Sequence, residues 1–151
     1  MLRDRLSETL KTALKAKEAR TVSTVRLILA ALKDRDIAAR SKGNQDGIDE
    51  ADVLSLLQSM IKQRRDSIKL YEKGGRLELA QQEGEEIEVI ETFLPEQLSD
   101  EDLASAVSTA ITEVDATTLK DMGKTMAALK TKYAGQMDFS KASALVKTQL
   151  G

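Results

Sequence analysis

The residues best placed to bind a charged ligand are two lysines one helical turn apart, in the segment Lys120-Asp121-Met122-Gly123-Lys124. At this spacing both ammonium groups share one face of a helix, near a helix N-terminus whose free N–H groups also favour anions. Gly123 costs a helix about 1 kcal/mol relative to alanine, which indicates that another group approaches its backbone closely. That group is either a neighbouring helix, slightly favoured from these residues alone, or the phosphate backbone of a nucleic acid. In the second case Lys130 and Lys132 would extend the binding surface.

Arg64 is a second residue in an unusual position. It lies three residues after Ile61 and four before Ile68, on the apolar stripe of a predicted long helix. An isolated buried charge is costly and is normally paired. We therefore expect its stem to pack at the margin of a helical bundle while its head group forms an ion pair with a carboxylate of the acidic segment that follows. A functional role for Arg64 is the less favoured alternative.

The residue types restrict the catalytic chemistry. The chain has no cysteine and no histidine, which removes thiol nucleophiles and the commonest general base and metal ligand. Metal sites in helical bundles normally combine glutamate with histidine. A solvated acidic face is therefore the favoured interpretation of the carboxylates Glu83, Glu85, Glu86, Glu88 and Glu91. Because phosphate-binding loops and dinucleotide fingerprints are also absent, we expect no catalytic residue, no metal ion and no cofactor.

Composition and charge favour a helical protein of the cytoplasm. Apolar residues make up 41% of the 151 residues and charged residues of both signs 32%, as amphipathic helices with solvated outer faces require. The net charge of −2 argues against indiscriminate nucleic-acid binding, so a polyanion must find local basic patches. The longest apolar run, residues 27–32, is too short to cross a bilayer, and the N-terminus lacks the apolar core of a signal peptide. These features predict a cytoplasmic protein without membrane contact.

The elements that must position these residues are all helical. Apolar residues recur at helical spacing and predict helices at about residues 2–17, 21–40, 50–73, 77–92, 100–114 and 119–134, and a seventh that opens at Asp138 or Ser140 and runs to about residue 150. The single proline, Pro95, should end one helix, and Ser99 with Asp102 should start the next. We therefore expect an all-α fold with a four-helix N-terminal unit, residues 1–94, and a small three-helix C-terminal domain, residues 95–151. Leu94 should pack in the first core and Leu98 in the second.

Three segments carry a resemblance to a known family: Lys62-Gln63-Arg64-Arg65-Asp66-Ser67, Glu91-Thr92-Phe93-Leu94-Pro95-Glu96-Gln97-Leu98 and Lys120-Asp121-Met122-Gly123-Lys124-Thr125-Met126. In this order and spacing they resemble the YqeY proteins of the GatB/YqeY-like family, over nearly the whole chain. The C-terminal part is also similar to the tail domain of GatB, the B subunit of the tRNA-dependent amidotransferase. That enzyme converts Glu-tRNA(Gln) or Asp-tRNA(Asn) to the amidated form.

The resemblance implies a pair of small helical domains and a role close to tRNA. The tail domain of GatB contributes to tRNA recognition and not to the chemistry, and the cradle and metal-dependent kinase site of GatB have no counterpart here. Although the family is associated with a carbon–nitrogen ligase activity that uses glutamine as amido-N-donor, we expect no intrinsic activity. The chain also departs from the family, because Gln136-Met137-Asp138-Phe139 stands where an Arg-Ala-Asp-Gly stretch is common. This chain therefore has one basic residue fewer at that place.

Three functions follow, in order of preference. The first is a non-catalytic module that binds tRNA or another folded RNA, associated with amidotransferase or aminoacyl-tRNA synthetase machinery. Because only four aromatic residues are present, it would recognise shape and phosphates instead of stacking on single-stranded bases. The second is a helical protein–protein adaptor without RNA binding, whose acidic helices meet a basic partner. The third, least favoured, is a catalytic amidotransferase subunit.

Overall fold

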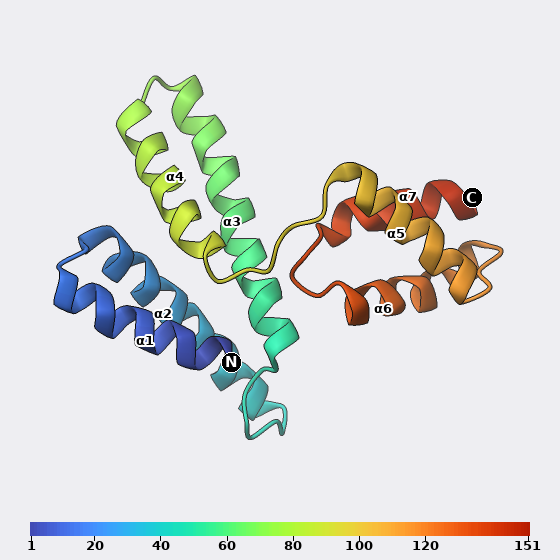
Figure 1. Cartoon of the computed structure of the whole chain (residues 1–151), viewed down its shortest axis with the longest axis horizontal. Coiled ribbons are helices and arrows are strands. Elements are labelled where there is room, and N and C mark those ends of the chain that lie inside the picture. The colour runs from blue at the N-terminus through green and yellow to red at the C-terminus, as the bar shows by residue number, and fades with distance from the viewer. The chain divides into compact units, whose positions relative to one another are not determined.

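The computed structural model of the chain describes residues 1–151 and contains seven α-helices and one turn of 3-10 helix, with no β-strand (Figure 1). The prediction of an all-α fold is confirmed. The chain divides into two compact units, Met1–Leu94 and Pro95–Gly151, which we call unit 1 and unit 2. No helix is long and apolar enough to span a membrane.

Unit 1 consists of two helical hairpins. The first joins α1 (Leu2–Ala16) to α2 (Ala19–Ser41), and the second joins α3 (Glu50–Lys73) to α4 (Leu77–Glu91) (Figure 1). The two helices of each hairpin pack together, and α2 also contacts α3 and α4. The most deeply buried large side chains of this core are Leu6, Val25, Ile28, Leu57 and Ile90.

An ion pair between the half-exposed Arg3 and the buried Asp36 fixes the connection between α2 and α3. The guanidinium group of Arg3 makes two hydrogen bonds to the Asp36 carboxylate, at 2.7 and 2.8 Å, and a third to the carbonyl oxygen of Ile48 at 2.7 Å. Asp36 also accepts the Ile48 N–H at 3.0 Å. Gly47 has a φ of +83°, and a Cβ there would collide with the Asp36 carboxylate. The hydrogen bonds from Arg3 and Ile48 outweigh burial and lower the pKa of Asp36 from 3.8 to about 2.

The segment around Pro95 has the helix end and the helix start that the sequence predicts. The helix before it ends at Glu91, and α5 begins after Ser99, whose hydroxyl accepts a hydrogen bond from the N–H of Asp102 at 3.1 Å. Leu94 packs against the core of unit 1 and Leu98 against the core of unit 2. Both placements confirm the expectation drawn from the proline.

Unit 2 contains α5 (Asp100–Glu113), the 3-10 turn η1 (Leu119–Asp121), α6 (Met122–Lys132) and α7 (Phe139–Leu150). Each of the three α-helices packs against the other two. Val107, Leu129, Ala142 and Val146 form the centre of a small core. The predicted helix from residue 119 is thus a 3-10 turn for its first three residues and an α-helix only from Met122.

Candidate nucleic-acid interface

The four lysines predicted to bind RNA all lie on η1 and α6 with exposed side chains. Lys120 belongs to η1, and Lys124 to the first turn of α6. Lys130 and Lys132 lie in the last turn of α6. Residues 119–132 hold these four lysines and one acidic residue, Asp121, although unit 2 as a whole has six lysines and eight acidic residues. The segment is therefore a local basic surface on an otherwise acidic unit.

At the start of this segment, the side chains of Thr118 and Asp121 accept hydrogen bonds from backbone N–H groups. The Thr118 hydroxyl accepts the N–H of Lys120 at 3.3 Å. The Asp121 carboxylate accepts the N–H groups of Thr117 and Thr118 at 2.8 and 3.2 Å, which lowers its pKa. The predicted capping pair, Thr118 with Asp121, is confirmed. The expectation that free N–H groups at this terminus would help to bind an anion is wrong in part, because the capping box satisfies the N–H of Lys120.

Asp121 also forms an ion pair with Lys124, and the sequence analysis did not predict this pair. The Nζ atom of Lys124 lies 3.5 Å from Oδ1 of Asp121, and the Lys124 side chain remains 50% exposed. The three-residue spacing of the two residues was the available signal, since side chains at this separation meet on a helix. A surface pair of this kind contributes little to stability, so Lys124 can exchange Asp121 for a phosphate oxygen at small cost.

Gly123 faces open space. It is exposed, and a Cβ built on it would meet no heavy atom within 4 Å. Within unit 2, therefore, no neighbouring helix requires this glycine. The other alternative, a contact between Gly123 and the phosphate backbone of a nucleic acid, stays a prediction.

Lys130 and Lys132 differ in where they project. An α-helix turns about 100° and rises about 1.5 Å per residue, so these two lysines point to nearly opposite sides of α6. Lys132 is the closer to Lys124 in rotation, at about 80°, and lies about 12 Å further along the axis. Its Nζ atom is 5.6 Å from the centre of the Tyr133 ring. A flat surface that contacts Lys124 can therefore reach Lys132 more easily than Lys130.

Arg64 is a structural residue of unit 1. Its Nε atom donates a hydrogen bond to Oε2 of Glu86 at 2.9 Å, and one terminal nitrogen donates to the carbonyl oxygen of Met60 at 3.2 Å. The side chains of Arg64 and Glu86 are only 13% and 8% exposed. Glu83, 3.9 Å from the same Nε atom, has a raised pKa because it is partly buried and lies near Glu86. The favoured prediction, an ion pair between Arg64 and the acidic helix, is confirmed.

The acidic helix α4 is engaged by arginines of unit 1 instead of being wholly solvated. Arg20 lies 3.1 Å from Glu85, and Arg65 lies 3.3 Å from Glu91. Within residues 1–151 no group of three or more acidic side chains is placed to hold a metal ion. These ion pairs show that Glu85, Glu86 and Glu91 join α4 to its neighbours, whereas Glu88 is exposed and forms no ion pair.

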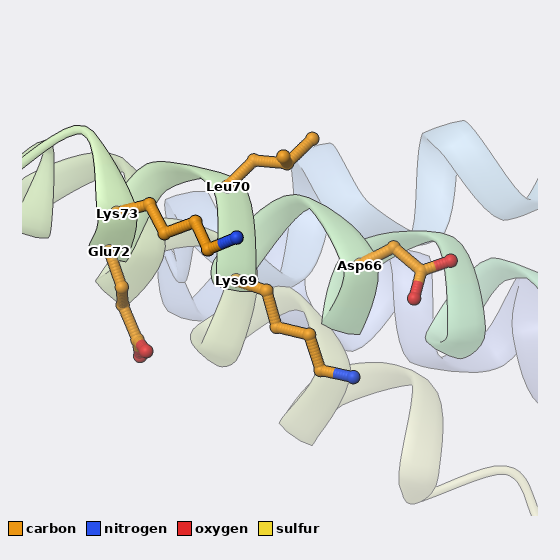
Figure 2. A pocket seen from close by; sticks show the side chains of 5 residues that line it. All are labelled: Asp66, Lys69, Leu70, Glu72 and Lys73. Atoms are coloured by element: carbon orange, nitrogen blue, oxygen red, sulfur yellow. The ribbon is translucent and has the colours of Figure 1, made fainter.

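A shallow hollow on α3 does not form a site. Its lining side chains, Asp66, Lys69, Leu70, Glu72 and Lys73, all come from the last two turns of one helix. Figure 2 shows that these side chains point in different directions and do not converge. A ligand there would meet no set of polar groups directed at one point, as binding sites require.

Comparison with known proteins places these features in context. A family model described as "Yqey-like protein" matches residues 3–150. "Altered inheritance of mitochondria protein 41, mitochondrial" of Lachancea thermotolerans is 32% identical over 111 residues, which are 72% of this chain and 57% of that protein. The protein of the same name from Vanderwaltozyma polyspora is 34% identical over 89 residues, 59% of this chain and 46% of that protein. The chain thus spans about half the length of these curated relatives.

The relatives contradict one expectation. Those compared above are named as mitochondrial proteins, so the prediction of a cytoplasmic protein is wrong. It rested on the lack of an apolar signal segment and of a membrane span. Neither feature distinguishes the cytoplasm from the mitochondrion, because mitochondrial targeting segments are amphipathic and not continuously apolar.

Proposed function

Because the chain belongs to the family of YqeY-like proteins, we propose that it is a non-catalytic module that contacts tRNA or another folded RNA through η1 and α6. This function rests on the resemblance of its C-terminal motif to the tail of GatB and on the geometry of that motif. Associated amidotransferase or aminoacyl-tRNA synthetase machinery is part of the same proposal.

The observation that carries the proposal is the open space at Gly123, between two exposed lysines. A glycine in a helix is destabilising relative to alanine, and no atom of unit 2 lies close enough to Gly123 to require its small size. A sugar–phosphate backbone could approach Gly123 closely, with Lys120 before it and Lys124 after it in the chain to neutralise phosphates. Lys132 extends the contact along the helix.

The electrostatics favour a local contact over general attraction. Unit 2 carries more acidic than basic residues, so RNA is repelled from most of its surface and attracted to residues 119–132. The scarcity of aromatic residues favours recognition of a folded RNA by its shape and phosphates. The adaptor alternative is less supported, since arginines of unit 1 already engage Glu85, Glu86 and Glu91.

The test is a charge reversal with a matched control. Lys120→Glu with Lys124→Glu should weaken tRNA binding at least about tenfold at moderate salt. It should also lower the slope of log affinity against log salt by about 0.7–0.9 for each phosphate that the variant no longer neutralises. Lys11→Glu with Lys15→Glu makes the same change in net charge on α1. It also breaks a similar ion pair, because Lys11 lies 3.5 Å from Glu8 at the same three-residue spacing.

The outcome separates three possibilities. A weaker affinity only in the α6 variant, with helicity and melting near wild type, supports the proposal. Equally weakened binding in both variants would indicate diffuse attraction and would overturn the assigned site. A wild-type chain that does not bind tRNA at moderate salt would remove the proposed function and leave the adaptor.

A further inference from the structure

The solvent side of α2 exposes two large apolar residues around Asp34, where a surface helix is normally polar. The inner side of α2 supplies buried residues such as Val25, Ile28 and Leu32 to the core of unit 1. Its opposite side carries Leu27, 47% exposed, and Ile37, 50% exposed, with exposed Ala30 and Ala38. We call Leu27, Ala30, Ile37 and Ala38 the outer face of α2. Because an amphipathic helix of a globular protein has one apolar side, this second apolar side lacks a partner in unit 1.

A row of cations borders the outer face. Arg26, Lys33 and Arg40 are exposed and follow one another at intervals of seven residues. Seven residues complete almost two turns of helix, so the three side chains form a nearly straight line with steps of about 10 Å. Arg26 and Lys33 form no hydrogen bond or ion pair within the chain, and Arg40 donates only to the carbonyl oxygen of Gln45, at 3.2 Å.

We propose that the outer face of α2 docks an acidic amphipathic helix of a partner protein. Leucine-type side chains of that helix would cover Leu27 and Ile37, and the small side chains of Ala30 and Ala38 would let the two helix axes approach closely. A row of carboxylates along one edge would pair with the row of cations. This surface lies in unit 1 and is independent of the proposed RNA contact on α6.

Charge and shape favour an acidic helix over RNA and over a second copy of the chain. RNA would use the cations but would leave Leu27 and Ile37 without apolar contacts, and no aromatic side chain is present on α2 for stacking on bases. A second copy of the chain offers no complementary helix. Its other exposed large apolar residues occur singly on separate elements, namely Met1, Leu14, Leu70, Leu77 and Leu119. Its own α2 carries the same positive row.

Asp34 adds a requirement for the partner. It is exposed within the outer face, because at about 100° per residue it lies between Ala30 and Leu27 around the helix axis. A partner helix with acidic residues along one edge and a basic residue among its leucines would satisfy both the cations and Asp34. A helix with a leucine or a carboxylate against Asp34 would leave that charge unpaired, so the surface is selective among acidic helices.

The experiment uses the full chain and a synthetic helix of about 20 residues, a length at which isolated helices begin to be stable. One peptide carries leucines at helical spacing with glutamates beside them, and a matched peptide carries lysine in place of each glutamate. Fluorescence anisotropy measures binding. The acidic peptide should bind saturably, with a Kd of about 10–100 µM, and the basic peptide should not bind.

Two variants of α2 test the two components of the surface. The apolar variant combines Leu27→Gln with Ile37→Gln, and the charge variant combines Arg26→Glu with Lys33→Glu. Each should weaken binding of the acidic peptide at least about tenfold. The control Leu70→Gln with Leu77→Gln changes two other exposed leucines and should leave the affinity unchanged. Since all six side chains are exposed, circular dichroism should show the wild-type fold throughout.

Four results would overturn the proposal. The first is that the acidic peptide does not bind saturably up to about 1 mM, and the second is that both peptides bind equally. The third is that neither α2 variant changes the affinity, and the fourth is that the leucine control weakens binding as much as the α2 variants do. If sedimentation shows a dimer that only the α2 variants dissociate, the occupant is a second copy. If Arg26→Glu with Lys33→Glu abolishes tRNA binding, the face is an RNA surface. Either finding also overturns a partner helix.

Discussion

Replacing Gly123 with alanine should move stability and RNA binding in opposite directions. The added Cβ meets no heavy atom within 4 Å, so the folded state accepts it without strain. Alanine has the higher helix propensity and restricts the unfolded chain, so the free energy of unfolding should rise by about 0.5–1 kcal/mol. If a phosphate backbone contacts Gly123, the same Cβ must push it away. A misfit of about 1 kcal/mol or more would weaken tRNA affinity about fivefold or more.

Gly84→Ala is the matched control. Gly84 also lies within a helix, α4, and a Cβ there also meets no atom within 4 Å. Its substitution should raise the free energy of unfolding by a similar amount and leave tRNA binding unchanged. Urea denaturation measures the first quantity, and filter binding or anisotropy with labelled tRNA measures the second.

The opposed signs make the result easy to interpret. A general disruption of the fold would lower stability and binding together, whereas a blocked contact lowers binding alone. If Gly123→Ala binds tRNA as tightly as wild type, no backbone approaches Gly123, and the observation that carries the proposed function is removed.

The other predictions concern stability and catalysis. Asp36→Asn should lower the free energy of unfolding by about 2–3 kcal/mol at pH 7, with exposed Asp34→Asn as a control near zero. Since the pKa of Asp36 is lowered from 3.8 to about 2, its contribution is complete above about pH 5 and is lost as the pH falls through about 2, so urea titrations of wild type and variant should converge below that pH. Arg64→Met should cost about 3 kcal/mol because it leaves Glu86 buried without its ion pair, whereas Arg65→Met, at an exposed pair, should cost less than about 1 kcal/mol. The purified chain with ATP, magnesium, glutamine and misacylated tRNA should leave the RNA unchanged, and turnover that a point substitution in this chain abolishes would contradict a non-catalytic role.

The sequence was sufficient for the helices and for Arg64 because both depend on local patterns. Helical spacing of apolar residues marks the inner side of each helix, and a charge on that side implies a nearby partner. Asp36 obeys the same rule, since it follows Ile28 and Leu32 at four-residue steps. Its partner Arg3 lies 33 residues away, and nothing in the periodicity connects them. That ion pair depends on tertiary packing of α1 against α2.

The candidate interface was predictable in its residues but not in its geometry. Spacing alone placed Lys120 and Lys124 near a helix start. It did not show that Asp121 forms an ion pair with Lys124 or that Gly123 faces open space. Both facts depend on how the turn before α6 closes and on which side of α6 packs inward. The outer face of α2 was missed because Leu27 and Ile37 were indistinguishable from core residues until their exposure was known.

Nuclear magnetic resonance of the isotope-labelled full chain titrated with tRNA tests the proposed function most directly. The account predicts that the backbone amides with the largest shifts or line broadening lie within residues 119–132, centred on Gly123 and Lys124. It also predicts that raising the salt concentration reverses these changes. Changes spread over both units, changes confined to unit 1, or an unchanged spectrum would contradict an RNA contact on α6.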